Sequence, residues 1–148
     1  MRDTFELLVD EDSLEMNSIG TIWGAVWCEV GGIPFPERTW NDMAPAVVVA
    51  LFTAARTAAR PGFFSPIDVY FFDGPFRLRL RPTQSDDLMI DFLHRDREFM
   101  TSAAVDRRNL VDAVQKAAGR LVLECEQRGW SDNDDVYELR RQWNAPMM

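Results

Sequence analysis

Hydrophobic and polar residues alternate in several short stretches of this chain, and each stretch predicts a β-strand. The stretches cover residues 4–9, 19–30, 67–73, 76–81 and 88–94, with a weaker pattern over residues 99–105. Within the longest one, Ile22, Val26, Cys28 and Val30 share a face, and we expect that face to be buried.

The segments 76–81 and 88–94 predict a hairpin with a definite register. Apolar residues alternate with arginines in the first strand and with acidic residues in the second. Apolar matching pairs Leu80 with Leu88, Leu78 with Ile90 and Phe76 with Phe92, and it also pairs Arg81 with Asp87 and Arg77 with Asp91. Each pair would contribute a few tenths to ~1 kcal/mol. This pairing explains the arginines better than a phosphate-binding strand, because no aromatic residues are interleaved on their face.

Helical spacing of apolar residues predicts two long helices. The first begins near Asn41 or Asp42, carries Pro45 in its first turn and continues to Ala59. The second is capped by Asp106 and runs to about Arg128, and its core stripe consists of Leu110, Val114, Ala117, Leu121 and Cys125.

A short last helix, capped by Asp132 or Asp134, would run through Trp143. The order of elements predicts a single α+β domain over residues 1–148. It would hold a mostly antiparallel sheet of about five to six strands. Two long helices would pack on one side of that sheet, followed by the short C-terminal helix.

The net charge of the chain narrows the functions that we expect of it. The chain has 24 acidic and 16 basic residues in 148 positions, a formal net charge of -8. Nucleic-acid binding is disfavoured, because phosphate contacts need clustered cations. An acidic field attracts basic ligands, so we expect a basic protein partner. Plain solubility is the alternative explanation of the charge.

The sequence predicts a cytoplasmic location and no membrane segment. The first six residues lack the apolar core of a signal peptide, and the longest apolar run, residues 44–55, is too short to span a bilayer. Cys28 and Cys125 have no metal or redox spacing, so we interpret them as reduced core thiols.

No catalytic constellation, metal site or cofactor motif is recognisable. His94, the single imidazole, has Asp91 and Asp96 nearby in sequence but no nucleophile beside it, which favours a structural role. The run Asp132, Asn133, Asp134 and Asp135 lacks the glycine and terminal glutamate of a calcium loop, so helix capping and solvation explain it more simply.

Trp23 and Trp27 share the second face of the long strand. They are candidates for interface anchors, since Trp is enriched at binding hot spots, and core packing is the alternative. The apolar area of Trp23, Trp27, Trp40 and Trp143 is equally compatible with a homodimer.

The order of several motifs resembles a known family. Residues 28–42 contain a strand end, a Gly31-Gly32 turn, a Phe-Pro element and a Trp-x-Asp motif that leads into an apolar helix; residues 72–76 and 124–130 follow. This order is similar to small acidic bacterial proteins found beside polymorphic or contact-dependent toxin genes and thought to be immunity proteins. The similarity covers most of the chain, rests on turns, caps and a helix end, and implies no catalytic residues.

We therefore expect a non-enzymatic protein-binding module, an immunity protein that neutralises a cognate toxin by occluding its active or substrate-binding surface. The candidate partner-binding residues are Trp23, Trp27, Glu37, Asp42, Asp132, Asp134 and Asp135. The alternatives are a secretion-system chaperone or adaptor, a small-molecule-binding regulatory domain, and an enzyme that uses His94 with Asp91 or Asp96.

Overall fold

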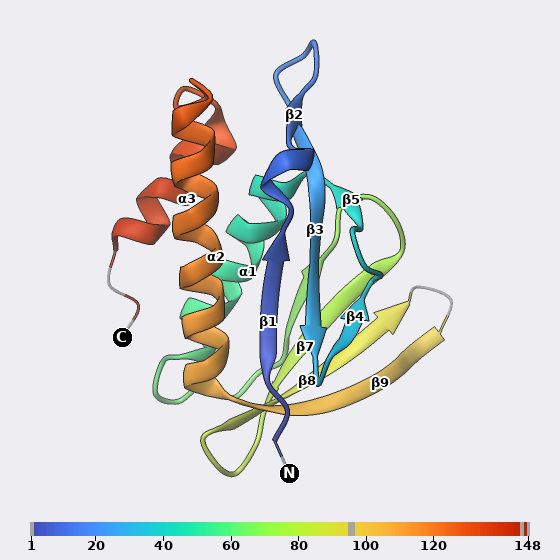
Figure 1. The fold of residues 1–148 in the computed structure, drawn as a ribbon. Coiled ribbons are helices and arrows are strands. Elements are labelled where there is room, and N and C mark those ends of the chain that lie inside the picture. Colours follow the sequence, from blue (N-terminus) through green and yellow to red (C-terminus); the bar gives the residue numbers. More distant parts are fainter. Residues whose placement is uncertain (1, 95–96, 146, 148) are drawn as a thin grey trace.

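The computed structural model describes residues 2–94, 97–145 and 147, and it has an α+β architecture with two antiparallel sheets (Figure 1). The helices are η1 (Glu11–Ser13, a 3-10 helix), α1 (Ala44–Ala58), α2 (Arg107–Gln127) and α3 (Asp134–Asn144). The five-stranded sheet contains β1 (Phe5–Val9), β2 (Glu15–Met16), β3 (Ile22–Val30), β4 (Ile33–Phe35) and β5 (Asn41–Asp42). The four-stranded sheet has the order β6 (Ile67–Tyr70), β7 (Phe76–Pro82), β8 (Asp87–His94) and β9 (Arg97–Asp106).

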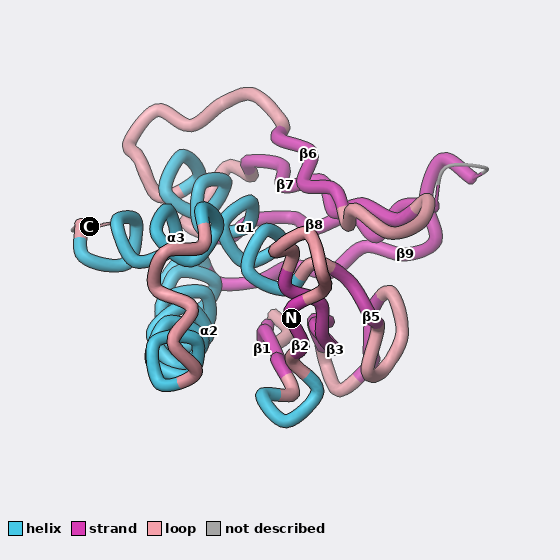
Figure 2. The backbone as a smooth tube through the Cα atoms, turned by 90° about the horizontal axis from the view of Figure 1, so that it is seen from above, coloured by secondary structure: helices cyan, strands magenta, loops and turns pink. Residues whose placement is uncertain are grey.

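Strand β3 organises the first sheet, because each of the other four strands pairs with it in antiparallel fashion. Its predicted inner face is confirmed: Ile22, Val26, Cys28 and Val30 are all buried. The prediction of one sheet with five to six strands is wrong, because the strands form two sheets, one of five and one of four strands. Strands β2, β4 and β5 were not predicted, since they are too short to show an alternating pattern. The three α-helices do lie on one side of the molecule, as both Figure 1 and Figure 2 show, whereas η1 lies in the connection between β1 and β2.

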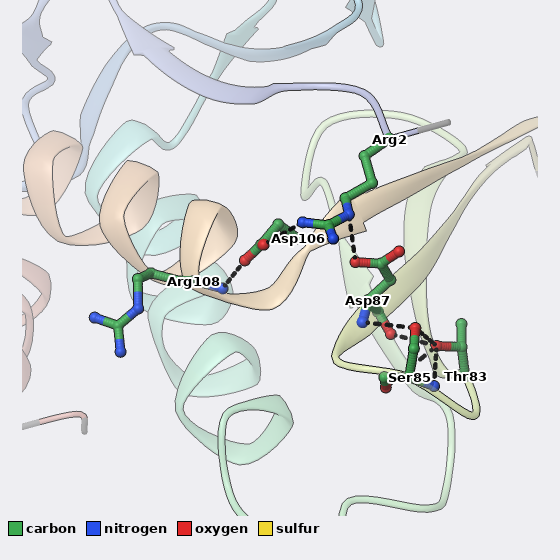
Figure 3. Close-up of polar contacts among 6 residues, drawn as sticks. All are labelled: Arg2, Thr83, Ser85, Asp87, Asp106 and Arg108. Atoms are coloured by element: carbon green, nitrogen blue, oxygen red, sulfur yellow. Dashed lines mark hydrogen bonds and ion pairs between the residues drawn. The ribbon is translucent and has the colours of Figure 1, made fainter.

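The β7–β8 hairpin has the predicted faces but a register shifted by two residues. Leu80 lies opposite Ile90 and Arg79 lies opposite Asp91. The shift comes from the turn, where the Thr83 hydroxyl donates to the Asp87 carbonyl oxygen (2.7 Å) and accepts from the Ser85 N–H (Figure 3). The turn is therefore centred one residue later in the chain than apolar matching alone predicts, on Ser85 instead of Gln84.

The shifted register also changes the ion pairs. Arg81 donates to both oxygens of Asp91, at 2.7 and 2.9 Å, instead of pairing with Asp87. Arg79 donates to both oxygens of Asp68 on β6, at 2.7 and 3.2 Å. The arginines of β7 thus pair with acids on both neighbouring strands.

Phe35 lies where the two sheets meet. Its ring makes edge contacts with Phe71, Phe76 and Phe92 of the second sheet, at centroid distances of 5.1 to 6.0 Å. Such edge-to-face pairs add ~0.5–1.5 kcal/mol each beyond the area they bury. This aromatic cluster belongs to one continuous hydrophobic core that also includes the inner faces of α1 and α2.

The segment before β1 joins the sheets a second time. The Asp3 N–H donates to the Ala104 carbonyl oxygen of β9 (2.8 Å). Arg2 bridges Asp87 and Asp106, at 3.1 and 2.7 Å, and these two acids lie directly opposite each other on β8 and β9 (Figure 3). Like charges in that position repel, so Arg2 compensates a cross-strand conflict.

Helix α2 agrees closely with its prediction. The Asp106 carboxylate accepts from the Arg108 N–H (2.8 Å) as an N-cap, and Gly129 takes a left-handed conformation (φ 79°) after the helix. The predicted core stripe from Leu110 to Cys125 is buried. Helix α3 differs, because its N-cap is Asn133 rather than Asp132 or Asp134.

Replacing Gly24 of β3 with alanine is expected to destabilise the fold by about 1–3 kcal/mol. A Cβ atom there would lie 2.7 Å from the Leu14 side chain and 3.3 Å from its Cα atom, and Leu14 is fully buried. Urea unfolding would measure the loss. Gly119→Ala is the matched comparison, since the three atoms nearest to its Cβ all belong to the partly exposed Trp143 indole, which can move. An equal or smaller loss for Gly24→Ala would contradict the expectation.

Candidate functional site

An open groove of about 620 Å³ lies between the turn of the β2–β3 hairpin and the start of α3. We call it the acidic groove. It is lined by Met16, Ile19, Gly20, Thr21, Gly129, Trp130, Asp132, Asn133, Asp134 and Asp135. Three of the predicted partner-binding residues, Asp132, Asp134 and Asp135, therefore share one wall.

Two asparagine side chains set the geometry of the acidic groove. The Asn17 side-chain oxygen accepts from the N–H groups of Ile19 and Thr21, which shapes the hairpin turn. Asn133 caps α3 by accepting from the N–H groups of Asp135 and Val136, and its amide nitrogen donates to the Gly20 carbonyl oxygen (2.7 Å). Asn133 thus fixes the hairpin against the first turn of α3.

The acidic groove is negative on one side and apolar on the other. None of its ten lining residues is basic, and none of its three acids forms an ion pair within the described part of the chain. Arg128 lies over the Trp130 ring, but its guanidinium donates to Glu124 and to backbone oxygens of Leu14 and Glu11. Ile19, 84% exposed, projects at the opposite wall.

Burial raises the pKa of Asp135 above the ordinary value of an aspartate, and the charge of Asp134 raises it further. The groove therefore holds a carboxylate that is partly withdrawn from water and lacks a cation. A cationic group placed beside Asp135 would relieve both effects, so the site favours binding of a positive charge.

This pKa shift predicts a pH dependence of stability. The folded state binds a proton on Asp135 more readily than the unfolded state does. Its contribution therefore favours folding at low pH and is lost as the pH rises through the two pKa values. Relative to wild type, Asp135→Asn should gain stability as the pH rises from the ordinary pKa of an aspartate through the raised pKa of Asp135, by less than ~1 kcal/mol at this partly exposed site. Urea unfolding at several pH values measures the difference, and a difference that does not change with pH would contradict the prediction.

Two predicted residues are buried, which removes them from any docking surface. Trp27 is 9% exposed and its indole N–H donates to Glu29 (3.2 Å). Asp42 is completely buried, and its carboxylate accepts hydrogen bonds from four N–H groups. The sequence suggested surface roles for both, but Trp27 packs on the second face of β3 and Asp42 fixes a loop.

The remaining two candidates lie outside the acidic groove. Trp23 is half-buried and pairs with Glu15 in the β2–β3 ladder. Glu37 is exposed in the connection between β4 and β5, and Figure 1 shows this connection and α3 on opposite sides of β3. Sequence reasoning missed Met16 and Ile19 as lining residues, because residue 19 was expected to begin a strand that in fact begins at Ile22.

The groups considered for catalysis are engaged elsewhere. Asp91 accepts from Arg81 and from the Ser102 hydroxyl (2.6 Å), and the ring of His94 contacts Phe76 at 5.1 Å. Asp96, the other acid considered beside His94, lies outside the described residues. Cys28 and Cys125 are buried and unpaired, and burial raises the pKa of both thiols, that of Cys125 to about 12.

Within residues 2–94, 97–145 and 147, no group of three or more His, Cys, Asp or Glu side chains is placed to hold a metal ion. No helix in that part of the chain is both long and apolar enough to cross a bilayer. Comparisons with protein-family models, with curated proteins and with solved structures gave no match to this chain.

Proposed function

We propose that this chain is a protein-binding module that captures a basic protein partner at the acidic groove. We further propose that it serves as an immunity protein, neutralising a cognate toxin by occluding its active or substrate-binding surface. The observation that carries the proposal is the convergence of Asp132, Asp134 and Asp135 in an open groove without a basic residue, opposite the exposed Ile19.

Several acids outside the groove, unlike the three inside it, are paired with arginines within the chain. Asp68, Asp91, Glu124 and Glu138 each have an arginine partner at 2.6 to 2.8 Å. Their charges are largely compensated within the chain. The acids of the groove are not compensated in this way, so their charge is available to an incoming molecule.

The combination of charge and apolar surface fits a specific protein complex. Uncompensated carboxylates accelerate the encounter with a basic surface, whereas buried apolar anchors mainly determine the dissociation rate. Ile19, Met16 and Trp130 supply apolar area beside the carboxylates. A lysine or arginine side chain of the partner would reach the carboxylates while its neighbours cover Ile19.

The small-molecule alternative has weaker structural support. A small-molecule regulatory domain needs an enclosed apolar cavity, typically ~300–1,000 Å³. Of the two mostly apolar pockets, the one between β4 and β9 has only about 230 Å³, and the one beside β6 is an open groove rather than an enclosed cavity. A chaperone or adaptor would also use an acidic groove, and it is separated from an immunity protein by function rather than by geometry.

Co-expression with the product of the gene immediately upstream tests the proposal, with host growth and co-purification as readouts. A toxic upstream product, rescued growth and a stable complex would support the immunity role. A stable complex with a product that is not toxic would favour the chaperone or adaptor. A toxic product that this chain neither binds nor neutralises would overturn the proposed pairing.

A further inference from the structure

Strand β6 forms an open edge of the four-stranded sheet. Among the strands of the described residues it pairs with β7 alone, and Figure 2 shows it on the outer side of that sheet. The Phe71 N–H donates to the Phe76 carbonyl oxygen (3.0 Å), so odd-numbered residues of this segment direct their backbone groups toward β7. The N–H and C=O groups of Asp68 and Tyr70 therefore point outward. Across the described residues we find no hydrogen bond to them.

This edge lacks the charged protection that open strands usually carry. The only charged residue of β6, Asp68, is directed along the sheet, where it accepts two hydrogen bonds from Arg79 and lies 3.4 Å from Arg77. Its carboxylate is therefore engaged within the sheet and does not hinder another strand from pairing with the outward N–H and C=O groups of β6. Tyr70, the last residue of β6, lies on the same face of the strand as Asp68.

Aromatic side chains surround the open edge. Phe64, Tyr70 and Phe72 are 82%, 55% and 49% exposed. An open and largely apolar groove of about 360 Å³ runs beside them, between β6 and the Ala50–Thr57 part of α1. Exposed aromatic patches beside an unpaired edge are typical of interaction surfaces.

We propose that a second copy of this chain adds to this edge, with the two β6 strands antiparallel and Asp68 of each copy opposite Tyr70 of the other. In that register both residue pairs exchange their outward N–H and C=O groups, which gives four new backbone hydrogen bonds around a two-fold axis. The two four-stranded sheets would become one continuous sheet.

Charge complementarity favours a copy of this chain in this register. Pairing Asp68 with Tyr70 keeps the two Asp68 carboxylates apart, whereas pairing Asp68 with Asp68 would set like charges opposite each other. Arg77 lies against the Tyr70 ring (6.0 Å to its centroid), so each Asp68 would approach an arginine of the other copy. We call the contact between the two β6 strands the seam. Each chain would contribute Arg77, Arg79 and Asp68 to it, so the seam avoids the repulsion that a net charge of -8 imposes elsewhere.

The antiparallel arrangement also places the exposed aromatic residues together. The segment that precedes β6 in one copy would run beside the segment that follows β6 in the other, which brings Phe64 toward Phe72 of the second copy. The open edge ends at Phe72, because the N–H groups of Phe72 and Asp73 donate to Asp42. The seam is therefore short, and the aromatic contacts must supply much of its affinity.

Sedimentation velocity over a range of concentrations tests the dimer. Wild type should reach twice the 17.0 kDa chain mass. Tyr70→Lys should weaken association by roughly tenfold or more, because a lysine guards the edge. Tyr137→Lys is the matched control, since Tyr137 is 57% exposed and also lies against an arginine, 5.8 Å from Arg140. A monomer at every concentration, or equal weakening by both variants, would overturn the proposal.

Cysteine cross-linking tests the register. A mixture of Asp68→Cys and Tyr70→Cys chains should form a disulfide-linked heterodimer under mild oxidation faster than either variant forms a homodimer. Faster linking of Asp68→Cys to itself would overturn the register. The proposed toxin complex at the acidic groove uses other residues, so failure of either proposal leaves the other intact.

Discussion

Replacing Asp42 with alanine is expected to lower the free energy of unfolding by about 3–5 kcal/mol. The carboxylate accepts from the Trp40 indole N–H (3.0 Å) and from the backbone N–H groups of Met43, Phe72 and Asp73, at 2.7, 3.0 and 3.2 Å. Asp42 is fully buried, so truncation would leave these donors without their acceptor in a site that excludes water.

The position of Asp42 makes this loss larger than that of one local contact. Asp42 belongs to β5 of the first sheet, whereas Phe72 and Asp73 begin the turn after β6 of the second sheet. The same carboxylate orients Trp40, whose ring makes an edge contact with Phe76 at 5.3 Å. The variant would therefore weaken the joint between the two sheets as well as the loop.

Urea unfolding of Asp42→Ala and Asp42→Asn measures this effect. The asparagine variant keeps the volume but turns an N–H₂ group toward N–H donors, so we expect it to be destabilised as well. Asp73→Ala is the control, because its exposed side chain is removed while its backbone N–H stays. A loss below about 1 kcal/mol for Asp42→Ala would contradict the role we assign to the carboxylate.

The elements predicted correctly are those with long, regular patterns. The inner face of β3 and the core stripe of α2 follow directly from apolar spacing, and the Asp106 cap follows from its place before that stripe. The two-residue strands β2 and β5 carry no such pattern. The turn of the β7–β8 hairpin is held by hydrogen bonds of the Thr83 and Ser85 hydroxyls, which apolar matching cannot detect.

The site shows the same difference between features that have a sequence pattern and features that do not. Asp132, Asp134 and Asp135 are adjacent in sequence, so an acidic cluster was visible before the structure, but its apolar wall comes from a hairpin more than a hundred residues earlier. The turn-forming residues Asn17 and Gly20 flank Ile19, and they are the sequence signal for the tight turn that forms this wall. Core packing of Trp27 was one of the two alternatives that the sequence left open, and the structure has it buried. The burial of Asp42 had no sequence signal, because it depends on the packing of a loop from the second sheet.

Reversing the three acids of the acidic groove to lysine is expected to weaken binding of the upstream gene product by about 100-fold at low salt. The triple variant Asp132→Lys, Asp134→Lys and Asp135→Lys would place positive charge where the partner's cations must lie. Most of the loss should appear in the association rate, and the remaining affinity should depend less on salt concentration. Surface plasmon resonance at several salt concentrations measures both quantities.

A control with the same change in net charge separates the groove from the overall field of the protein. Asp73, Asp86 and Asp112 are exposed acids outside the acidic groove, and their reversal to lysine should weaken binding much less. Equal losses in the two triple variants would contradict a docking site at the groove. Ile19→Ser completes the test, because removing an apolar anchor should raise the dissociation rate while leaving the salt dependence unchanged. The association rate constant would then report the electrostatic attraction of the acidic wall. The dissociation rate constant would report the apolar contact at the opposite wall, which contains Ile19.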